Sequence, residues 1–173
     1  MTLFHYLCIM IDRAPILTVA FTGHRTYAGS ADSELRTTIA ELYRRGARRF
    51  RVGMAEGFDI AAGEAVVELQ RVCNDIEIEA FIPYPSFPRH MGMGDQQRYE
   101  FILQHAQRCE YASERYYPGV FHRRNDMLIE GTEAVVAWYN GTKGGTQYTI
   151  RRALQQGARL INLYHDGQLR MTL

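Results

Sequence analysis

The sequence predicts an α/β fold in which a doubly wound, mainly parallel sheet has helices on both faces. Short continuous apolar runs, which are typical of strands buried on both faces, alternate with segments whose apolar residues recur at helical spacing. Regular alternation of this kind indicates parallel strands joined by helical crossovers. The chain has 173 residues, of which 46% are hydrophobic and 23% charged. That is the size and composition of one soluble globular domain.

We therefore expect a single domain over residues 1–173, with residues 1–14 as an N-terminal extension. Met10 stands directly before Ile11, so we expect residues 1–9 to be an extension from an upstream start site that carries no function. They are apolar but lack the basic start and small-residue cleavage site of a signal peptide. The longest apolar run is far shorter than the roughly 20 residues that span a bilayer. These features predict a cytoplasmic protein without a membrane partner.

The first half of the chain predicts three strand-helix units. A β-rich apolar run at residues 16–21 is followed by a helix that Ser30 or Asp32 caps and that ends near Gly46. Two further strands are expected at residues 50–52 and 76–82, each followed by a helix. The inward faces of the three helices are predicted to carry Leu35, Ile39, Leu42 and Tyr43; Ala62, Val66, Leu69 and Cys73; and Tyr99, Ile102, Leu103 and Ala106.

The second half of the chain predicts the remaining helices and strands. The pattern of apolar residues is weak directly after Cys109 and clear from Ala134 onward. Residues 111–112 are expected to form a short strand and residues 121–130 a short helix. Residues 134–138 are an apolar run typical of a buried strand, and the glycine-rich loop 141–146 follows it. A further helix and a last strand at residues 160–163 complete the sheet. The inward face of that helix is predicted to carry Ile150, Ala153 and Leu154.

Charge and cysteine content exclude several classes of function. The 20 Lys+Arg and 19 Asp+Glu residues leave a formal net charge of +1, which argues against binding duplex DNA by bulk electrostatics. Cys8, Cys73 and Cys109 are an odd number at wide spacing, so they indicate neither a disulfide framework nor a zinc site. The histidines also lack metal-ligand spacing. The sequence therefore predicts no metal site and no cofactor.

Three glycine-containing loops follow predicted strands, and we expect the chemistry of the protein there. They are Thr22-Gly23-His24-Arg25, the segment from Gly53 to Asp59, and the segment from Gly141 to Thr146. In an open parallel sheet the ligand crevice lies beyond the carboxyl ends of the strands, where helix N-termini bind anions. Three such loops at one edge predict a phosphate site. None has the Walker A or Gly-x-Gly-x-x-Gly pattern, which disfavours a P-loop NTPase and an ordinary dehydrogenase.

Four blocks of the sequence together resemble the YpsA-like family of the SLOG superfamily. They are Thr22-Gly23-His24-Arg25, Gly53-Met54-Ala55-Glu56-Gly57-Phe58-Asp59, Phe121-His122-Arg123-Arg124-Asn125-Asp126-Met127, and Tyr139-Asn140-Gly141 followed by Gly144-Gly145-Thr146. The resemblance implies a Rossmann-like fold that binds nucleotides or nucleotide-derived ligands. The same superfamily contains the cytokinin-activating phosphoribohydrolases, or LOG proteins, and the DprA proteins, which bind single-stranded DNA.

The loops and the resemblance together predict the residues that bind the ligand. Phosphate is expected on the backbone N–H groups of the glycine loops and on Arg25 and Arg124, and ribose on Asp59. Structural alternatives remain open, because His24 can hold its loop and Asp59 and Thr146 can cap helices. The predicted set is Thr22, Gly23, His24, Arg25, Gly53, Glu56, Gly57, Asp59, Arg124, Asn125, Gly144, Gly145 and Thr146.

One departure from the LOG pattern leaves open whether the protein is an enzyme. The LOG loop reads Gly-Gly-x-Gly-Thr-x-x-Glu, and its glutamate acts on the N-glycosidic bond together with an arginine from the preceding helix. Arg124 matches that arginine, but Thr149 occupies the glutamate position and cannot serve as a carboxylate. A hydrolase would then combine Arg124 with Glu56, Glu130 or Glu133.

The favoured function is binding of a nucleotide or nucleotide-derived ligand at the carboxyl edge of the sheet, by a sensor or regulatory protein. The first alternative is a LOG-like phosphoribohydrolase of nucleoside monophosphates. The second, single-stranded DNA binding, is supported only by the arginine-rich segment 44–51, which is more often a solvated helix end. A homodimer is implied by the resemblance alone. Four aromatic residues in loops either stack on a base or fill the core of a loop, and we expect them to fill the core. They are Tyr84, Phe87, Tyr116 and Tyr117.

Overall fold

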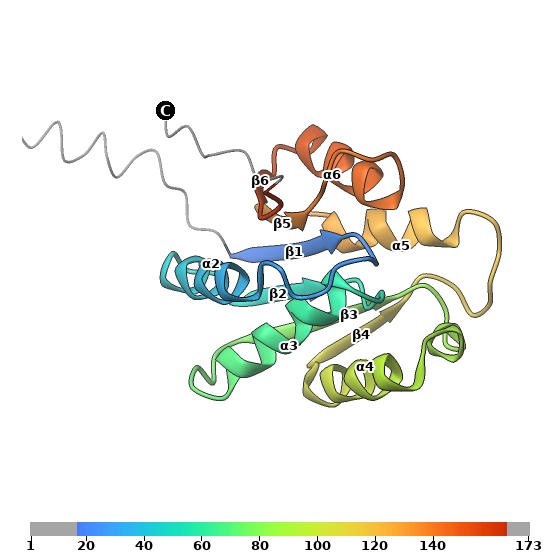
Figure 1. Cartoon of the computed structure of the whole chain (residues 1–173), viewed down its shortest axis with the longest axis horizontal. Helices are drawn as coiled ribbons and strands as arrows, with labels where there is room; N and C mark the ends of the chain where they lie inside the picture. Colours follow the sequence, from blue (N-terminus) through green and yellow to red (C-terminus); the bar gives the residue numbers. More distant parts are fainter. Residues whose placement is uncertain (1–16, 166–173) are drawn as a thin grey trace, which may run out of the picture.

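The computed structural model describes residues 17–165, so Cys8, Ile16 and the predicted N-terminal extension lie outside the described residues. Within this range the strands form one six-stranded sheet in the order β4-β3-β2-β1-β5-β6, and all neighbouring strands are parallel (Figure 1). The parallel α/β sheet predicted from the sequence is confirmed. The strands are β1 (Thr18–Gly23), β2 (Arg49–Val52), β3 (Glu77–Ile82), β4 (Arg108–Tyr111), β5 (Ala134–Trp138) and β6 (Arg159–Asn162).

Helices connect the strands in regular alternation, as the sequence pattern predicts. None of the helices within residues 17–165 is long and apolar enough to cross a membrane. Proline-rich residues after β3 form only a short 3-10 helix, because proline disrupts longer helices. The helices are α2 (Asp32–Arg44), α3 (Phe58–Gln70), η1 (Phe87–His90), α4 (Met93–His105), α5 (Val120–Ile129) and α6 (Gly145–Gln155).

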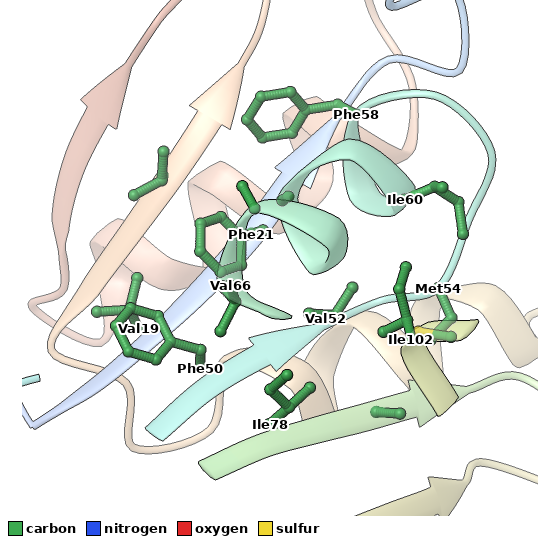
Figure 2. Close-up of a cluster of buried hydrophobic side chains, with 14 of the residues drawn as sticks. Val19, Phe21, Phe50, Val52, Met54, Phe58, Ile60, Val66, Ile78 and Ile102 are labelled. Carbon is green, nitrogen blue, oxygen red and sulfur yellow. The ribbon is translucent and has the colours of Figure 1, made fainter. Parts of the chain in front are cut away.

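The strand β1 lies inside the sheet and contributes to a hydrophobic core on each face. Val19 and Phe21 belong to the larger core, which is covered mainly by α2, α3 and α4. Figure 2 shows part of this core, with Phe58 and Val66 of α3 over the strands. Ala20, whose side chain points to the other face, packs in the smaller core under α5 and α6. Helices therefore cover both faces, and the doubly wound architecture is confirmed.

The connections that follow β1 and β5 lead to opposite halves of the sheet. β1 continues through α2 to β2 on one side, whereas β5 continues through α6 to β6 on the other. The two strands are neighbours, and their carboxyl ends pair at Gly23 and Trp138. Two connections that diverge from adjacent parallel strands form a topological switch point, where open sheets bind their ligands. The fold thus places the ligand crevice at the carboxyl ends of β1 and β5.

The start of α2 differs from the prediction that Ser30 or Asp32 caps it. The residue at the N-cap position is Ala31, and no side chain caps the helix directly. Instead, the Tyr27 hydroxyl accepts a hydrogen bond from the Ala31 backbone N–H at 3.1 Å and donates one to Asp32 Oδ1 at 2.6 Å. A tyrosine from the preceding loop therefore satisfies a free N–H group at this helix end, which sequence spacing does not reveal.

Two further local predictions differ from the structure. The short strand expected at residues 111–112 is β4, which begins earlier, at Arg108. Leu154, which was expected to face inward, has an exposed fraction of 50%. The buried residues of α6 are Thr146, Thr149, Ile150 and Ala153, and Leu154 lies about 90° around the helix from the middle of that face. Both errors concern the end of an element and leave the architecture unchanged.

Candidate functional site

A cavity of about 470 Å³ lies at the carboxyl edge of the sheet, at the switch point. Four segments far apart in the sequence surround it: the end of β1 with its loop, the start of α3, the first turns of α5, and the start of α6. Its volume is in the usual range for small-molecule sites. The residues that line this cavity are Thr22, Gly23, His24, Arg25, Ala55, Asp59, Phe121, His122, Arg124, Asn125, Gly145 and Thr146.

Most of the predicted ligand-binding residues line this switch-point cavity. Gly53, Glu56, Gly57 and Gly144 belong to the predicted set but are not among the lining residues. Three lining residues were missing from the set, namely Ala55, Phe121 and His122. Phe121 lies three and four residues before Arg124 and Asn125 on α5, so all three share one helix face. This helical spacing is the signal that predicts Phe121.

The N-terminal turns of α3, α5 and α6 all contribute to the cavity, and none of the three has a side-chain cap. The first N–H groups of a helix have no partner within the helix, and the helix dipole makes this end positive. Thr146 lies in the first turn of α6 without capping it. The cavity is therefore built to attract an anion.

Two oppositely charged side chains are buried at the cavity and incompletely paired. Arg124 Nη1 lies 3.8 Å from Asp59 Oδ2, and the exposed fractions of the two side chains are 7% and 6%. Arg124 Nη1 and Asp59 Oδ1 have no hydrogen-bond partner among residues 17–165. Among residues 17–165, the hydrogen bond that holds Arg124 runs from its Nε to Asn125 Oδ1 at 2.9 Å. Buried polar atoms without partners are costly, and a bound ligand would supply the missing ones.

Burial also changes the acid-base behaviour of this pair. Desolvation raises the pKa of Asp59 from 3.8 to about 6, against the opposing effect of the Arg124 charge. Desolvation lowers the pKa of Arg124, and the Asp59 charge opposes that shift. Asp59 does not cap α3, because its Oδ2 accepts a long hydrogen bond, 3.4 Å, from Ala55 N in the preceding loop. The capping role considered for Asp59 is therefore excluded.

Gly53 supports the buried pair from behind. A Cβ at this position would lie 2.5 Å from Arg124 Nη1 and 2.6 Å from Asp59 Oδ2, so any larger residue would displace both side chains. The next residue, Met54, is fully buried and has a φ of 59°, in the left-handed region that non-glycine residues rarely adopt. The turn after β2 is thus shaped around the Arg124–Asp59 pair.

His24 and Gly57 connect the loops around the cavity. His24 Nε2 accepts a hydrogen bond from the Asn140 backbone N–H at 3.2 Å, and the His24 carbonyl accepts one from Phe58 N at 3.4 Å. Gly57 has a φ of 79°, and a Cβ there would lie 2.5 Å from the Arg25 carbonyl oxygen. His24 therefore holds its loop while it lines the cavity, and Gly57 allows two loops to pack closely.

Arg25 places a free positive charge at the mouth of the cavity. Its side chain is exposed and forms no ion pair or hydrogen bond with the described residues. Its guanidinium lies 5.9 Å from the centre of the Phe121 ring, a cation–π arrangement. Because no carboxylate within residues 17–165 forms an ion pair with it, this guanidinium is available to an anionic ligand.

Within the described part of the chain, residues 17–165, Asp59 is the only carboxylate that lines the cavity. Glu133 accepts a hydrogen bond from Thr18 N at 2.7 Å, at the amino end of β1. Glu130 follows the last turn of the ten-residue helix α5, about 15 Å from the first turn. Thr149, at the position of the LOG glutamate, is fully buried and donates a hydrogen bond to the Gly145 carbonyl at 2.9 Å.

Three of the five arginines in segment 44–51 are paired with acidic residues of the chain. The contacts are Arg44–Glu41 at 2.7 Å, Arg48–Asp75 at 2.6 Å and Arg51–Glu79 at 2.7 Å. Arg49 begins β2, so the segment reaches the amino edge of the sheet, away from the cavity. The segment therefore supplies less free positive charge for a nucleic acid than its sequence indicates.

Curated relatives of this chain include several UPF0398 proteins. The chain is 30% identical over 113 residues to a UPF0398 protein of Bacillus cereus (strain B4264) and to one of Bacillus thuringiensis (strain Al Hakam). In each case the match covers 64% of this chain and 60% of the relative. The match thus spans three fifths of the length of these relatives.

Two solved structures of DNA processing protein A, DprA, are similar in fold. The protein from Streptococcus pneumoniae matches with a TM-score of 0.62 and 17% identity, over 85% of this chain and 50% of that chain. DprA from Helicobacter pylori, described for its single-stranded DNA binding mode, matches with a TM-score of 0.65 and 23% identity, over 89% and 67%. The family model described as the YspA SLOG family matches residues 19–165. Because that match includes nearly all the described residues, the chain belongs to the YspA SLOG family.

Proposed function

We propose that this protein binds a nucleotide or a nucleotide-derived ligand in the switch-point cavity and acts as a sensor or regulator. The observation that carries the proposal is the buried Arg124 guanidinium, whose Nη1 has no hydrogen-bond partner among the described residues. A cation in this position, beside three helix N-termini, is suited to a phosphate group. The ligand's phosphate completes the hydrogen bonding that the protein alone leaves unfinished.

The other lining residues supply the remaining contacts of a nucleotide. Arg25 offers a second, exposed guanidinium, and Thr146 a hydroxyl at the start of α6. Asp59 Oδ1 also lacks a partner within residues 17–165, and in the complex it accepts a hydrogen bond from a ribose hydroxyl. Cations for phosphate and a carboxylate for ribose are the donor and acceptor types that nucleotide recognition requires.

Binding without catalysis is favoured over hydrolysis by the chemistry of the lining residues. A LOG-like reaction needs a carboxylate that is free to act at the glycosidic bond. Thr149, at the position of the LOG glutamate, is buried with its hydroxyl bonded to the backbone, and Asp59 faces Arg124 through Oδ2 and is assigned to the ribose through Oδ1. The LOG-like hydrolase is still the alternative, now with Asp59 as the carboxylate beside Arg124 in place of the glutamates considered from the sequence, and its signature is release of free base.

The test is calorimetric titration with AMP, ADP-ribose, NAD and cyclic nucleotides, followed by analysis of each mixture for released base. A ligand at ~100 times its dissociation constant adds about 2.7 kcal/mol to the free energy of unfolding, so thermal unfolding gives a second measurement. Binding without released base supports the proposal. Released base shows an enzyme instead. A short single-stranded DNA is titrated in parallel, because the Helicobacter pylori structure is described as binding it.

Substitutions place the binding in the cavity. Arg124→Ala is expected to abolish nucleotide binding with the fold retained by circular dichroism. Arg123→Ala is the matched control, because Arg123 is exposed on the same helix and does not line the cavity. Arg25→Ala, at an exposed position, gives the same test if Arg124→Ala fails to fold. Unchanged affinity in both cavity variants would overturn the proposal.

A further inference from the structure

A second cavity, of about 490 Å³, lies directly beside the switch-point cavity. The two share Arg25 and Phe121 as lining residues, so they meet at these side chains. The second cavity is formed by the segment between β3 and the end of η1, the loop before α5, and the first turn of α5. The residues that line this aromatic cavity are Arg25, Tyr84, Ser86, Phe87, His90, Tyr116 and Phe121.

The walls of the aromatic cavity are rings held by edge-to-face contacts. Ring centres lie 5.8 Å apart for Tyr84–Phe87, 5.9 Å for Tyr84–Tyr116 and 5.8 Å for Phe87–Phe121. Tyr84 and Phe87 are buried, as expected for a loop core, but Tyr116 and Tyr117 are 60% and 37% exposed, contrary to that expectation. The buried rings fix the position of Tyr116, whose exposed face remains free to stack on a flat ligand.

Polar groups stand at the rim of the same cavity. The Ser86 hydroxyl and the His90 imidazole are exposed, and neither side chain has a hydrogen-bond partner among the residues that the structure describes. Arg25, shared with the first cavity, adds a guanidinium that is stacked on Phe121. Aromatic faces with hydrogen-bonding groups at their edges are the combination that proteins use to hold an unpaired nucleobase.

We propose that the aromatic cavity binds the base of the same ligand whose phosphate occupies the switch-point cavity. The ligand is then a nucleoside phosphate that lies across Arg25 and Phe121, with its base against Tyr116. The inference rests on the proposed function and adds to it, because it makes the base a major source of affinity. As the occupant of the aromatic cavity, the base of a nucleotide is favoured over a side chain of a partner protein, because the aromatic cavity adjoins the cavity proposed to bind the phosphate.

The experiment compares ligands with and without a base. AMP, GMP, CMP and UMP are each titrated against the full chain by calorimetry, beside ribose 5-phosphate and inorganic phosphate. The expected result is that at least one nucleotide binds on the order of tenfold tighter than ribose 5-phosphate, the difference expected for one stacked base. Tyr116→Ala is expected to remove most of this difference and to leave the affinity for ribose 5-phosphate unchanged.

Two control variants separate stacking from other effects. Tyr116→Phe keeps the ring and is expected to bind nucleotide as the wild type does. Tyr117→Ala changes the neighbouring exposed ring, which does not line the cavity, and is expected to have no effect. Equal affinity for nucleotide and ribose 5-phosphate in the wild type would overturn the base site while leaving the phosphate site intact. Failure of every phosphate compound to bind would overturn both proposals.

The aromatic cavity has one competing occupant, a second copy of the chain. If Tyr116→Ala changes the oligomeric state in sedimentation experiments without altering nucleotide affinity, the surface is a contact between copies and the base site is wrong. If the oligomeric state is unchanged and nucleotide affinity falls, the base site is supported.

Discussion

Two largely buried arginine–carboxylate pairs differ in how many of their polar atoms have hydrogen-bond partners. One joins Arg51 of β2 to Glu79 of β3, and the other joins Arg124 of α5 to Asp59 of α3. Arg51 Nε donates to Glu79 Oε2 at 2.7 Å, and its Nη1 reaches the backbone carbonyls of Leu128 and Glu130. Arg124 approaches Asp59 only to 3.8 Å, and one atom of each side chain has no partner within residues 17–165. Both pairs are largely buried, but only the first is complete.

The number of hydrogen bonds distinguishes a structural ion pair, Arg51–Glu79, from an ion pair whose polar atoms lack partners, Arg124–Asp59. The Arg51–Glu79 pair joins β2, β3 and the end of α5, and its hydrogen bonds offset much of the cost of burial. The Arg124–Asp59 pair bears that cost without full compensation, at the edge where the cavity opens. An uncompensated charge next to a cavity is expected where binding, rather than stability, is the function.

The largest effect is expected from breaking the complete pair. Arg51→Met leaves Glu79 buried without its main partner and removes the bonds to two carbonyls. We expect the free energy of unfolding to fall by about 3–5 kcal/mol in urea titrations, with nucleotide affinity unchanged in the folded fraction. Arg36→Met, which breaks the exposed pair with Glu68, is the control and should cost at most about 1 kcal/mol. Similar losses in both variants would remove the distinction between buried and exposed pairs.

A smaller effect is expected from the pH dependence of Asp59. Its pKa is about 6 in the folded protein, above the ordinary 3.8, so the folded state holds the proton more tightly than the unfolded state. The stability of the wild type relative to Asp59→Asn should therefore fall as pH rises from about 4 to about 6, by on the order of 2–3 kcal/mol. It should be flat above pH 7. Urea unfolding of both proteins across this range gives the measurement, and parallel curves would contradict the shifted pKa.

The smallest effect on stability is expected from replacing the incomplete pair with apolar residues. The double variant Asp59→Leu/Arg124→Met removes two buried charges but also the donor to Asn125 Oδ1 and the acceptor of Ala55 N, so we expect its free energy of unfolding to lie within about 1 kcal/mol of the wild type. It should bind no nucleotide. The corresponding double variant Arg51→Met/Glu79→Leu should be less stable than the wild type, because two carbonyls lose their donor. A stability loss of equal size in both double variants would show that the two pairs are alike.

The fold could be predicted from the sequence because its signals are local. The strand β5 is a run of apolar residues, Ala134–Trp138, and the helices repeat their apolar residues at the spacing of one face. The ends of elements were less well predicted. The cap of α2 comes from Tyr27, and Leu154 lies outside the buried face of α6, because both depend on packing that no local pattern records.

The candidate site was predicted in part for the same reason. A glycine in a loop marks an unusual backbone, but it does not tell whether a ligand or a side chain lies against it. Gly53 and Gly57 are predicted to contact a ligand; neither is among the lining residues, and an added Cβ would meet Arg124 at the first and the Arg25 carbonyl at the second. Phe121 was missed although it shares a helix face with Arg124 and Asn125, which were predicted, and His122 lies on α5 without that spacing, so only the folded structure places it at the cavity.

The assembly of the switch-point cavity from four distant segments has a consequence for folding cooperativity. No fragment shorter than the span from Thr22 to Thr146 contains all the residues that line the cavity. A bound ligand would therefore act as a cross-link between the two halves of the sheet on either side of β1 and β5. Its binding energy is added to the global unfolding transition, so amide hydrogen exchange should slow across all the strands together and not only in the loops that contact the ligand.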